Sequence, residues 1–229
     1  MKPILMTVEM AKATLDGRKT QTRRVCKTQS TTNEKPYLRP DGLYIYTLCN
    51  GVGTGYPFKC PYGKIGDRLY VRETHYRFGK WVKNGISKTG KQRWKFKATH
   101  DYDIRYYDNP PPNIRSNSYR KIGWYQRPSI FMPKWASRIK VDITDIRIGR
   151  VQDITVEDCL KEGIEMDSEY ASLLISQAES PYDCRAKHED IEKMVFENLW
   201  DSINLKRGYG WRVNPFIWVV EFKIAEVNK

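Results

Sequence analysis

Short strand-like segments, separated by two short helices, constrain the fold of this chain more than any other feature of its sequence. Residues 68–74 and 139–143 alternate apolar and polar side chains, as a half-buried strand does. Residues 216–224 begin with an apolar run, which is typical of a strand buried on both faces. The pattern predicts a compact α+β domain built around a small β-barrel.

The two short helices are predicted from their capping residues. The first begins after Thr7 and ends at Gly17, and the second begins after Thr155 and ends at Gly163. This places Glu162 in the last turn of the second helix, where a carboxylate faces the negative end of the helix dipole at a cost of about 0.3–1 kcal/mol. Residues in locally unfavourable positions are sometimes functional, so Glu162 is a candidate site residue.

Two further patterns concern buried positions. Glu73 lies on the core face of the strand predicted over residues 68–74, so its carboxylate needs a partner, and Arg72 and Arg138 are both candidates. The longest helix is expected over residues 188–204. Its predicted core face consists of Ile191, Met194, Val195, Asn198, Leu199 and Ser202.

Length and composition fit a single domain covering residues 1–229. Hydrophobic residues make up 40% of the chain, yet no apolar run approaches the roughly 18 residues of a membrane-spanning helix. Glu9 interrupts the N-terminal segment too early for a signal peptide, so a cytoplasmic protein is expected. The five cysteines form no Cys-x-x-Cys pair and the three histidines are scattered, which predicts reduced thiols, no metal site and no cofactor.

The charge of the chain predicts an anionic partner. Lysine and arginine total 40 against 27 acidic residues, which gives a net charge of +13. Such a balance attracts polyanions over long distances, and nucleic acid is the most common of these. A membrane surface is the weaker alternative because no basic amphipathic helix with a broad apolar face is evident. A role of the charge in solubility alone is the remaining alternative.

Two segments read as additions to the core, over residues 78–127 and 165–187. In the first, aromatic residues such as Trp81, Trp94 and Tyr125 are interleaved with lysines and arginines. Single-stranded nucleic acids are bound in this way, with bases stacked on rings and phosphates paired with cations. An ordinary hairpin with one solvated face explains the pattern equally well.

Four segments together resemble the ASCH-domain family of the PUA-like superfold. They cover residues 15–24, 66–73, 153–164 and 216–223, in the order of the family's opening signature, central strand, second helix and closing strand. The layout is most similar to the larger ASCH proteins that bacteriophages and prophages often encode. The resemblance implies a PUA-like β-barrel with short flanking helices, whose cleft binds RNA or recognises a modified base.

The resemblance also implies a catalytic set. Some small ASCH proteins are amidohydrolases that remove the acetyl group of N4-acetylcytidine, and Lys19, Thr22 and Glu162 match their proposed catalytic positions. Lys19 would act as base, Thr22 as nucleophile and Glu162 as proton shuttle. Residues three apart on a regular strand face opposite sides, so Lys19 and Thr22 converge only if the chain turns between them.

A wider set of residues is expected to line the cleft. Arginines would hold phosphate or an oxyanion and a tryptophan would stack on a base. The predicted binding residues are Arg23, Arg24, Arg72, Glu73, Trp135 and Arg138. The expected ligand is RNA, single-stranded DNA or a modified nucleoside. A non-catalytic reader of RNA or modified DNA, a ribonuclease using the same cleft, and a factor that binds a host protein remain alternatives, and the oligomeric state stays open.

Overall fold

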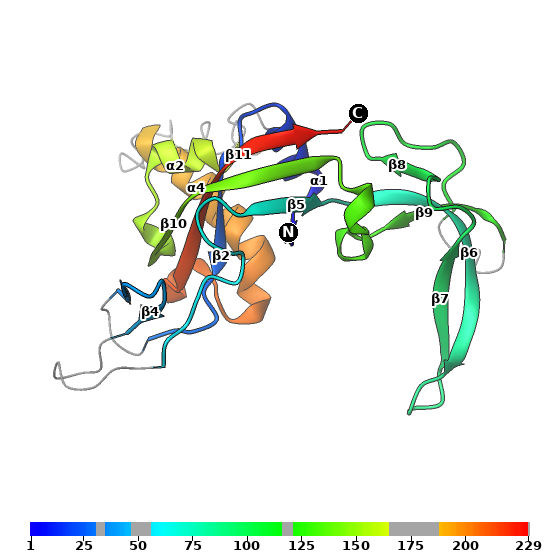
Figure 1. Cartoon of the computed structure of the whole chain (residues 1–229), viewed down its shortest axis with the longest axis horizontal. Coiled ribbons are helices and arrows are strands. Elements are labelled where there is room, and N and C mark those ends of the chain that lie inside the picture. The colour runs from blue at the N-terminus through cyan, green and yellow to red at the C-terminus, as the bar shows by residue number, and fades with distance from the viewer. Residues whose placement is uncertain (31–34, 47–55, 116–120, 165–187, 229) are drawn as a thin grey trace, which may run out of the picture.

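A five-stranded sheet forms the centre of the protein (Figure 1). The computed structural model describes residues 1–30, 35–46, 56–115, 121–164 and 188–228. Only the first two strands of the sheet run parallel, and the remaining neighbours are antiparallel. In spatial order the strands are β1 (Lys2–Leu5), β5 (Arg68–Arg72), β10 (Ile139–Arg150), β11 (Phe216–Val227) and β2 (Gln21–Val25).

The closing strand β11 is buried on both faces, as its apolar opening predicts. Phe216, Trp218 and Val220 join the main core together with residues of β5 and β10. Ile217 and Val219 point to the other face, where they meet residues of two helices. The alternation of a pleated strand therefore divides one continuous apolar run between two separate cores.

Among the described residues, three α-helices flank the sheet: α1 (Val8–Leu15), α2 (Val156–Lys161) and α4 (His188–Asn204). Thr7 caps α1 by accepting the N–H of Met10, and Thr155 caps α2 by accepting the N–H of Asp158. Both capping predictions and the length of the third helix are confirmed. Short 3₁₀ turns occupy Ser129–Phe131, Lys134–Ala136, Val151–Asp153, Leu205–Arg207 and Trp211–Val213.

The predicted core face of α4 is only partly correct, since Ile191 is buried but three other predicted residues are exposed. Phe196 and Trp200 are buried against α2 and β11, whereas Met194, Asn198 and Ser202 of the predicted face lie on the exposed side. Large rings compete better for burial than short polar side chains at neighbouring helical positions, because they remove more apolar surface from water.

A second sheet extends away from the first (Figure 1). Its central strand β6 pairs with β7 along its second half and with β8 and β9 along its first residues. It therefore covers most of the predicted addition at 78–127, while the one at 165–187 lies outside the described residues. The strands are β6 (His75–Ile86), β7 (Gln92–Ala98), β8 (Ile104–Tyr106) and β9 (Gly123–Arg127). A small hairpin joins β3 (Tyr37–Leu38) to β4 (Tyr44–Ile45).

The fold is α+β with mostly sheet and few helices, as predicted, but the described strands do not close into a barrel. The five-stranded sheet keeps two free edges, β1 and β2. Within the described part of the chain, a side chain spans the two edges, since the guanidinium of Arg24 on β2 donates to the carbonyl oxygen of Leu5 on β1. In the described parts of the chain, no helix is long and apolar enough to cross a membrane.

Candidate functional site

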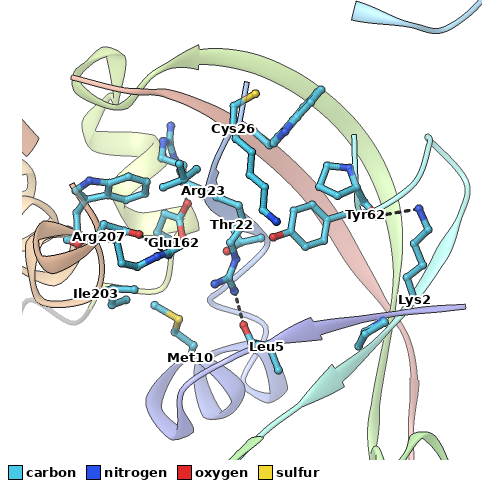
Figure 2. A pocket seen from close by; sticks show the side chains of 18 of the residues that line it. Lys2, Leu5, Met10, Thr22, Arg23, Cys26, Tyr62, Glu162, Ile203 and Arg207 are labelled. Carbon is cyan, nitrogen blue, oxygen red and sulfur yellow. Dashed lines mark hydrogen bonds and ion pairs between the residues drawn. The ribbon is translucent and has the colours of Figure 1, made fainter. Parts of the chain in front are cut away.

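A cavity of about 740 Å³ opens between the two free sheet edges and helix α4 (Figure 2). Its size lies within the range of small-molecule sites. The strand β1 contributes Leu5, β2 contributes Thr22, and α4 contributes Trp200. Figure 2 shows Thr22 and Glu162 reaching this space from different elements, with Tyr62 and Lys2 across from them.

The cavity wall is strongly cationic. Seven lysine and arginine side chains face it, whereas Glu162 is the single carboxylate among the described lining residues. The rest of the wall is largely apolar and includes five aromatic rings. The cations are Lys2, Arg23, Arg24, Lys27, Lys59, Arg72 and Arg207, and the rings are Phe58, Tyr62, Phe196, Trp200 and Trp218. Such a wall suits a ligand with both a planar apolar part and a negative charge.

A tight turn between α1 and β2 places Lys19. Gly17 adopts φ +75°, and the N–H of Lys19 donates to the carbonyl of Ala13 at 2.9 Å. The next N–H, from Thr20, donates to the carbonyl of Lys161 at the end of α2. Lys19 therefore precedes the first residue of β2, and the alternation of a strand does not separate it from Thr22.

Lys19 and Glu162 form a buried ion pair. The Lys19 Nζ lies 2.6 Å from Glu162 Oε2 and 2.7 Å from the Glu162 carbonyl oxygen. Burial lowers the pKa of Lys19 below its ordinary value, while the attraction of Glu162 opposes that shift. The ammonium thus loses water but keeps two strong acceptors.

Arg23 extends this pair into a network. Its guanidinium contacts Glu162 Oε1 at 3.3 Å and Asp158 Oδ2 at 2.6 Å. Asp158 also accepts from Gln21 and from Arg147, which holds Glu221 as well. The cations Lys19 and Arg23 offset the unfavourable position of Glu162 at the C-terminal end of α2, which sequence reasoning identified but could not explain.

The predicted site residues fall into two groups. Thr22, Arg23, Arg24, Arg72 and Glu162 line the cavity, and Lys19 lies directly behind Glu162 without being part of the described lining.

The remaining three predicted residues lie elsewhere. Glu73 is buried and forms a bidentate ion pair with Arg138, at 2.8 and 2.9 Å, which resolves its open choice of partner. Trp135 lines a smaller cavity beside the second sheet. Glu73, Arg138 and Trp135 are not among the described residues that line the first cavity. Glu73 follows β5, Arg138 precedes β10 and Trp135 lies in the 3₁₀ turn Lys134–Ala136, and all three are thus near the start of β6.

Several residues of the cavity wall were not predicted from the sequence. Trp200, Ile203 and Arg207 follow Phe196 at helical spacing and line the cavity together with it. The apolar residues of α4 carried this signal, but the predicted core face did not include Phe196 and Trp200. Tyr62 comes from a segment between strands, where periodicity gives no guide.

In the parts of the chain that the structure describes, no group of three or more His, Cys, Asp or Glu side chains is placed to hold a metal ion. Cys26, Cys60 and Cys159 are free and buried, and burial raises the pKa of the Cys159 thiol to about 12. Cys49 and Cys184 lie outside the described residues.

Comparison of the chain with protein-family models, with curated proteins and with solved structures finds no match in any of the three. The geometry of the site therefore carries the functional argument.

Proposed function

We propose that the cavity binds a modified nucleobase with its phosphate, and that the protein hydrolyses an amide on that base in the manner of N4-acetylcytidine deacetylation. The observation that carries the proposal is the single carboxylate of the wall, Glu162, held by the buried Lys19 in a cavity that Thr22 also lines.

The wall matches the two parts of such a ligand. Seven cations attract a phosphate, and arginine forks bind phosphate oxygens through paired hydrogen bonds. Rings such as Tyr62 and Trp200 offer surfaces on which a base can stack. This positive potential favours an anionic ligand over a neutral one.

The proposed reaction uses Thr22 and the Lys19–Glu162 pair. The hydroxyl oxygen of Thr22 attacks the acyl carbon, and its proton passes to the pair, whose cavity-facing member is Glu162. The pair returns a proton to the nitrogen of the base as the carbon–nitrogen bond breaks. Water then hydrolyses the ester on Thr22, and the acid leaves with the threonine hydroxyl restored. Arg23 or Arg24 stabilises the negative charge of the tetrahedral intermediates.

The lowered pKa of Lys19 supports this chemistry. A lysine with its ordinary pKa stays protonated near neutral pH and cannot take a proton. Burial weakens the hold of Lys19 on its proton, so the pair can pass between two protonation states during a turnover.

We also propose that the open sheet is a variant of the PUA-like fold of ASCH domains. Two of the four resembling segments, residues 15–24 and 153–164, meet through the Lys19–Glu162 pair. Such a meeting of distant segments is expected if both belong to one site.

A non-catalytic reader of nucleic acid is the second candidate. The observation in its favour is that the charges of Lys19, Arg23, Asp158 and Glu162 pair with one another, as in a purely structural ion-pair network.

The experiment uses an RNA oligonucleotide that carries one N4-acetylcytidine, with the products separated by chromatography. Wild-type protein and the Glu157→Gln control are expected to release cytidine-containing RNA of full length. Glu157 belongs to the same helix as Glu162 but is exposed. Glu162→Gln should lower turnover by about 10²-fold or more because the proton-transferring carboxylate is gone.

Other products would contradict the proposal in distinguishable ways. Shortened RNA would indicate a ribonuclease. Retention of the RNA with no change in any base would indicate a reader, and equal turnover by both glutamine variants would exclude Glu162 from the chemistry.

A further inference from the structure

A second cavity, of about 320 Å³, lies beside the second sheet, away from the site described above. Two arginines line it, Arg77 on β6 and Arg127 on β9, together with Phe96, Phe131 and Trp135. None of these residues lines the first cavity.

Both arginines are largely withdrawn from water. Arg77 is 7% exposed and Arg127 is 8% exposed. The guanidinium of Arg127 lies 4.7 Å from the ring centre of Phe96 and 4.5 Å from that of Phe131, and Arg77 lies 5.2 Å from that of Trp135. These rings hold the two guanidinium groups in place and offer only weak electrostatic compensation.

Asp101 is the one carboxylate among the described lining residues, which leaves the two arginines with a positive charge in excess. Arg77 contacts the Asp101 carboxylate at 3.5 Å and donates to the carbonyl oxygen of His100 at 3.4 Å, but the Asp101 side chain is 89% exposed. Within the described parts of the chain, Arg127 has no carboxylate within 4 Å, and the Nε of Arg77 is buried without a hydrogen-bond partner. Burial and the neighbouring Arg77 together hold the pKa of Arg127 below its usual range.

Buried cations in proteins are normally paired, because leaving them unpaired is costly. We propose that this cavity binds a phosphate group of a single-stranded nucleic acid, held between Arg77 and Arg127, with an adjacent base stacked on Trp135 or Phe131. An oxyanion supplies the missing negative charge, and the planar forks of two arginines suit its several oxygens.

The exposed rings at the mouth of the cavity favour nucleic acid over a free anion. Trp135 is 52% exposed and Phe131 is 59% exposed, although both are large rings next to the arginines. Base stacking on such rings and phosphate pairing with adjacent cations are the two contacts that single-stranded binders combine. A free phosphate ion would use the arginines only.

The site is independent of the proposed amide hydrolysis. Its occupancy is measured by binding alone, so a failure of either proposal leaves the other standing. It would give the protein a second hold on the same polymer, at a distance from the reacting base.

The test compares two double variants that remove the same charge. Arg77→Gln/Arg127→Gln changes the cavity, whereas Arg93→Gln/Lys95→Gln changes two exposed cations of β7. Arg93 and Lys95 alternate with Phe96 along the strand and so point away from the cavity. Binding of a fluorescent, unmodified single-stranded oligonucleotide is measured by anisotropy at about 0.15 M salt.

The cavity variant is expected to bind the oligonucleotide about tenfold or more weakly than wild type. The control variant should bind less than about threefold more weakly, because it loses only long-range attraction whereas the cavity variant also loses direct phosphate contacts. Equal weakening by the two variants would overturn the proposal and leave net charge as the only attraction. If millimolar inorganic phosphate displaces the oligonucleotide completely, the site binds a free anion and the nucleic-acid assignment is wrong.

A measurement on the wild-type protein covers the case in which the cavity variant fails to fold. Ultraviolet cross-linking of the bound oligonucleotide should label peptides that contain Phe131 or Trp135. Labelling confined to peptides of the first cavity, such as the one with Tyr62, would overturn the proposal.

Discussion

Lys19 and His75 show how burial changes the chemistry of single residues. Both side chains are almost completely buried, and burial is the largest cause of a lowered pKa in each. They differ in their partners, since Lys19 has a carboxylate at 2.6 Å whereas His75 has the carbonyl oxygen of Glu73 at 3.2 Å. The carboxylate of Glu162 opposes the effect of burial on the pKa of Lys19. Among the described residues, His75 has no such carboxylate partner, and its pKa of about 4 keeps it neutral over most of the physiological range.

The neutral His75 predicts a loss of stability in mild acid. Burial, with the nearby cations Arg77 and Arg127, lowers its pKa from 6.5 to about 4. The unfolded chain therefore binds a proton near pH 6.5 that the folded protein accepts only near pH 4. Between about pH 7 and pH 5 this should lower the free energy of unfolding by about 2 kcal/mol.

Denaturant unfolding of wild type and His75→Gln over this range measures the contribution as a difference, which removes the effect of the carboxylates. As the pH falls, the wild type should lose the free energy of unfolding that the neutral His75 contributes, and the variant should not. Parallel pH profiles for the two proteins would show that His75 does not titrate as described.

At the scale of elements, the site depends on a close approach between the turn before β2 and the end of α2. Gly163 follows Glu162 with φ +81°, and a methyl group there would lie 2.9 Å from Ala13 Cβ and 3.0 Å from Lys19 Cβ. Two constraints therefore favour glycine at this position: the left-handed backbone conformation, and the lack of space for a side chain beside Lys19.

Gly163→Ala is expected to destabilise the protein more than Gly208→Ala. Gly208 has almost the same φ of +80°, but no atom lies within 4 Å of its added methyl. The strain of left-handed backbone, about 1 kcal/mol, is common to both variants. Only Gly163→Ala should add a clash and reduce the proposed amide hydrolysis. Equal unfolding midpoints and equal activities of the two variants would contradict the role of this contact.

Local signals in the sequence predicted the elements better than their faces. Thr7 and Thr155 predict the starts of their helices correctly, because a helix cap is a contact between residues only three apart in sequence. The apolar opening of β11 likewise predicts a strand buried on both faces, because consecutive apolar residues are a local signal. The core face of α4 was misjudged because Phe196 and Trp200 gain burial only from α2 and β11, which lie far away in sequence. Likewise, Glu162 was recognisable as misplaced on its helix, but its compensation by Arg23 depends on a contact 139 residues away.

Across the whole molecule, Arg138 connects the two sheets. It precedes β10 of the first sheet, binds Glu73 after β5, and contacts Asp108 after β8 of the second sheet at 2.7 Å. Its guanidinium also lies 4.3 Å from the ring centre of Tyr106, at the end of β8. Sequence alone left Arg72 and Arg138 as equal partners of Glu73, since nothing local specifies a contact between segments 65 residues apart.

Glu73→Gln should lower the free energy of unfolding by about 3 kcal/mol, because it leaves Arg138 without its buried counter-charge. Asp108→Asn is the matched control, since it removes the exposed partner of the same arginine and should cost less than about 1 kcal/mol. Chemical denaturation measures both variants. Similar decreases in the free energy of unfolding for the two variants would mean that the buried Glu73–Arg138 pair stabilises the protein no more than the exposed Asp108–Arg138 pair.

The central claim is that Thr22 attacks an amide in a cavity built for a charged nucleobase ligand. The most direct measurement is the release of acetate from N4-acetylcytidine 5′-monophosphate by wild type, Thr22→Val and Thr28→Val. Both threonines line the cavity, and valine keeps the shape of each while removing the hydroxyl. The account predicts turnover by wild type and Thr28→Val and none above background by Thr22→Val. Turnover that persists in Thr22→Val, or is absent from the wild type, would contradict it.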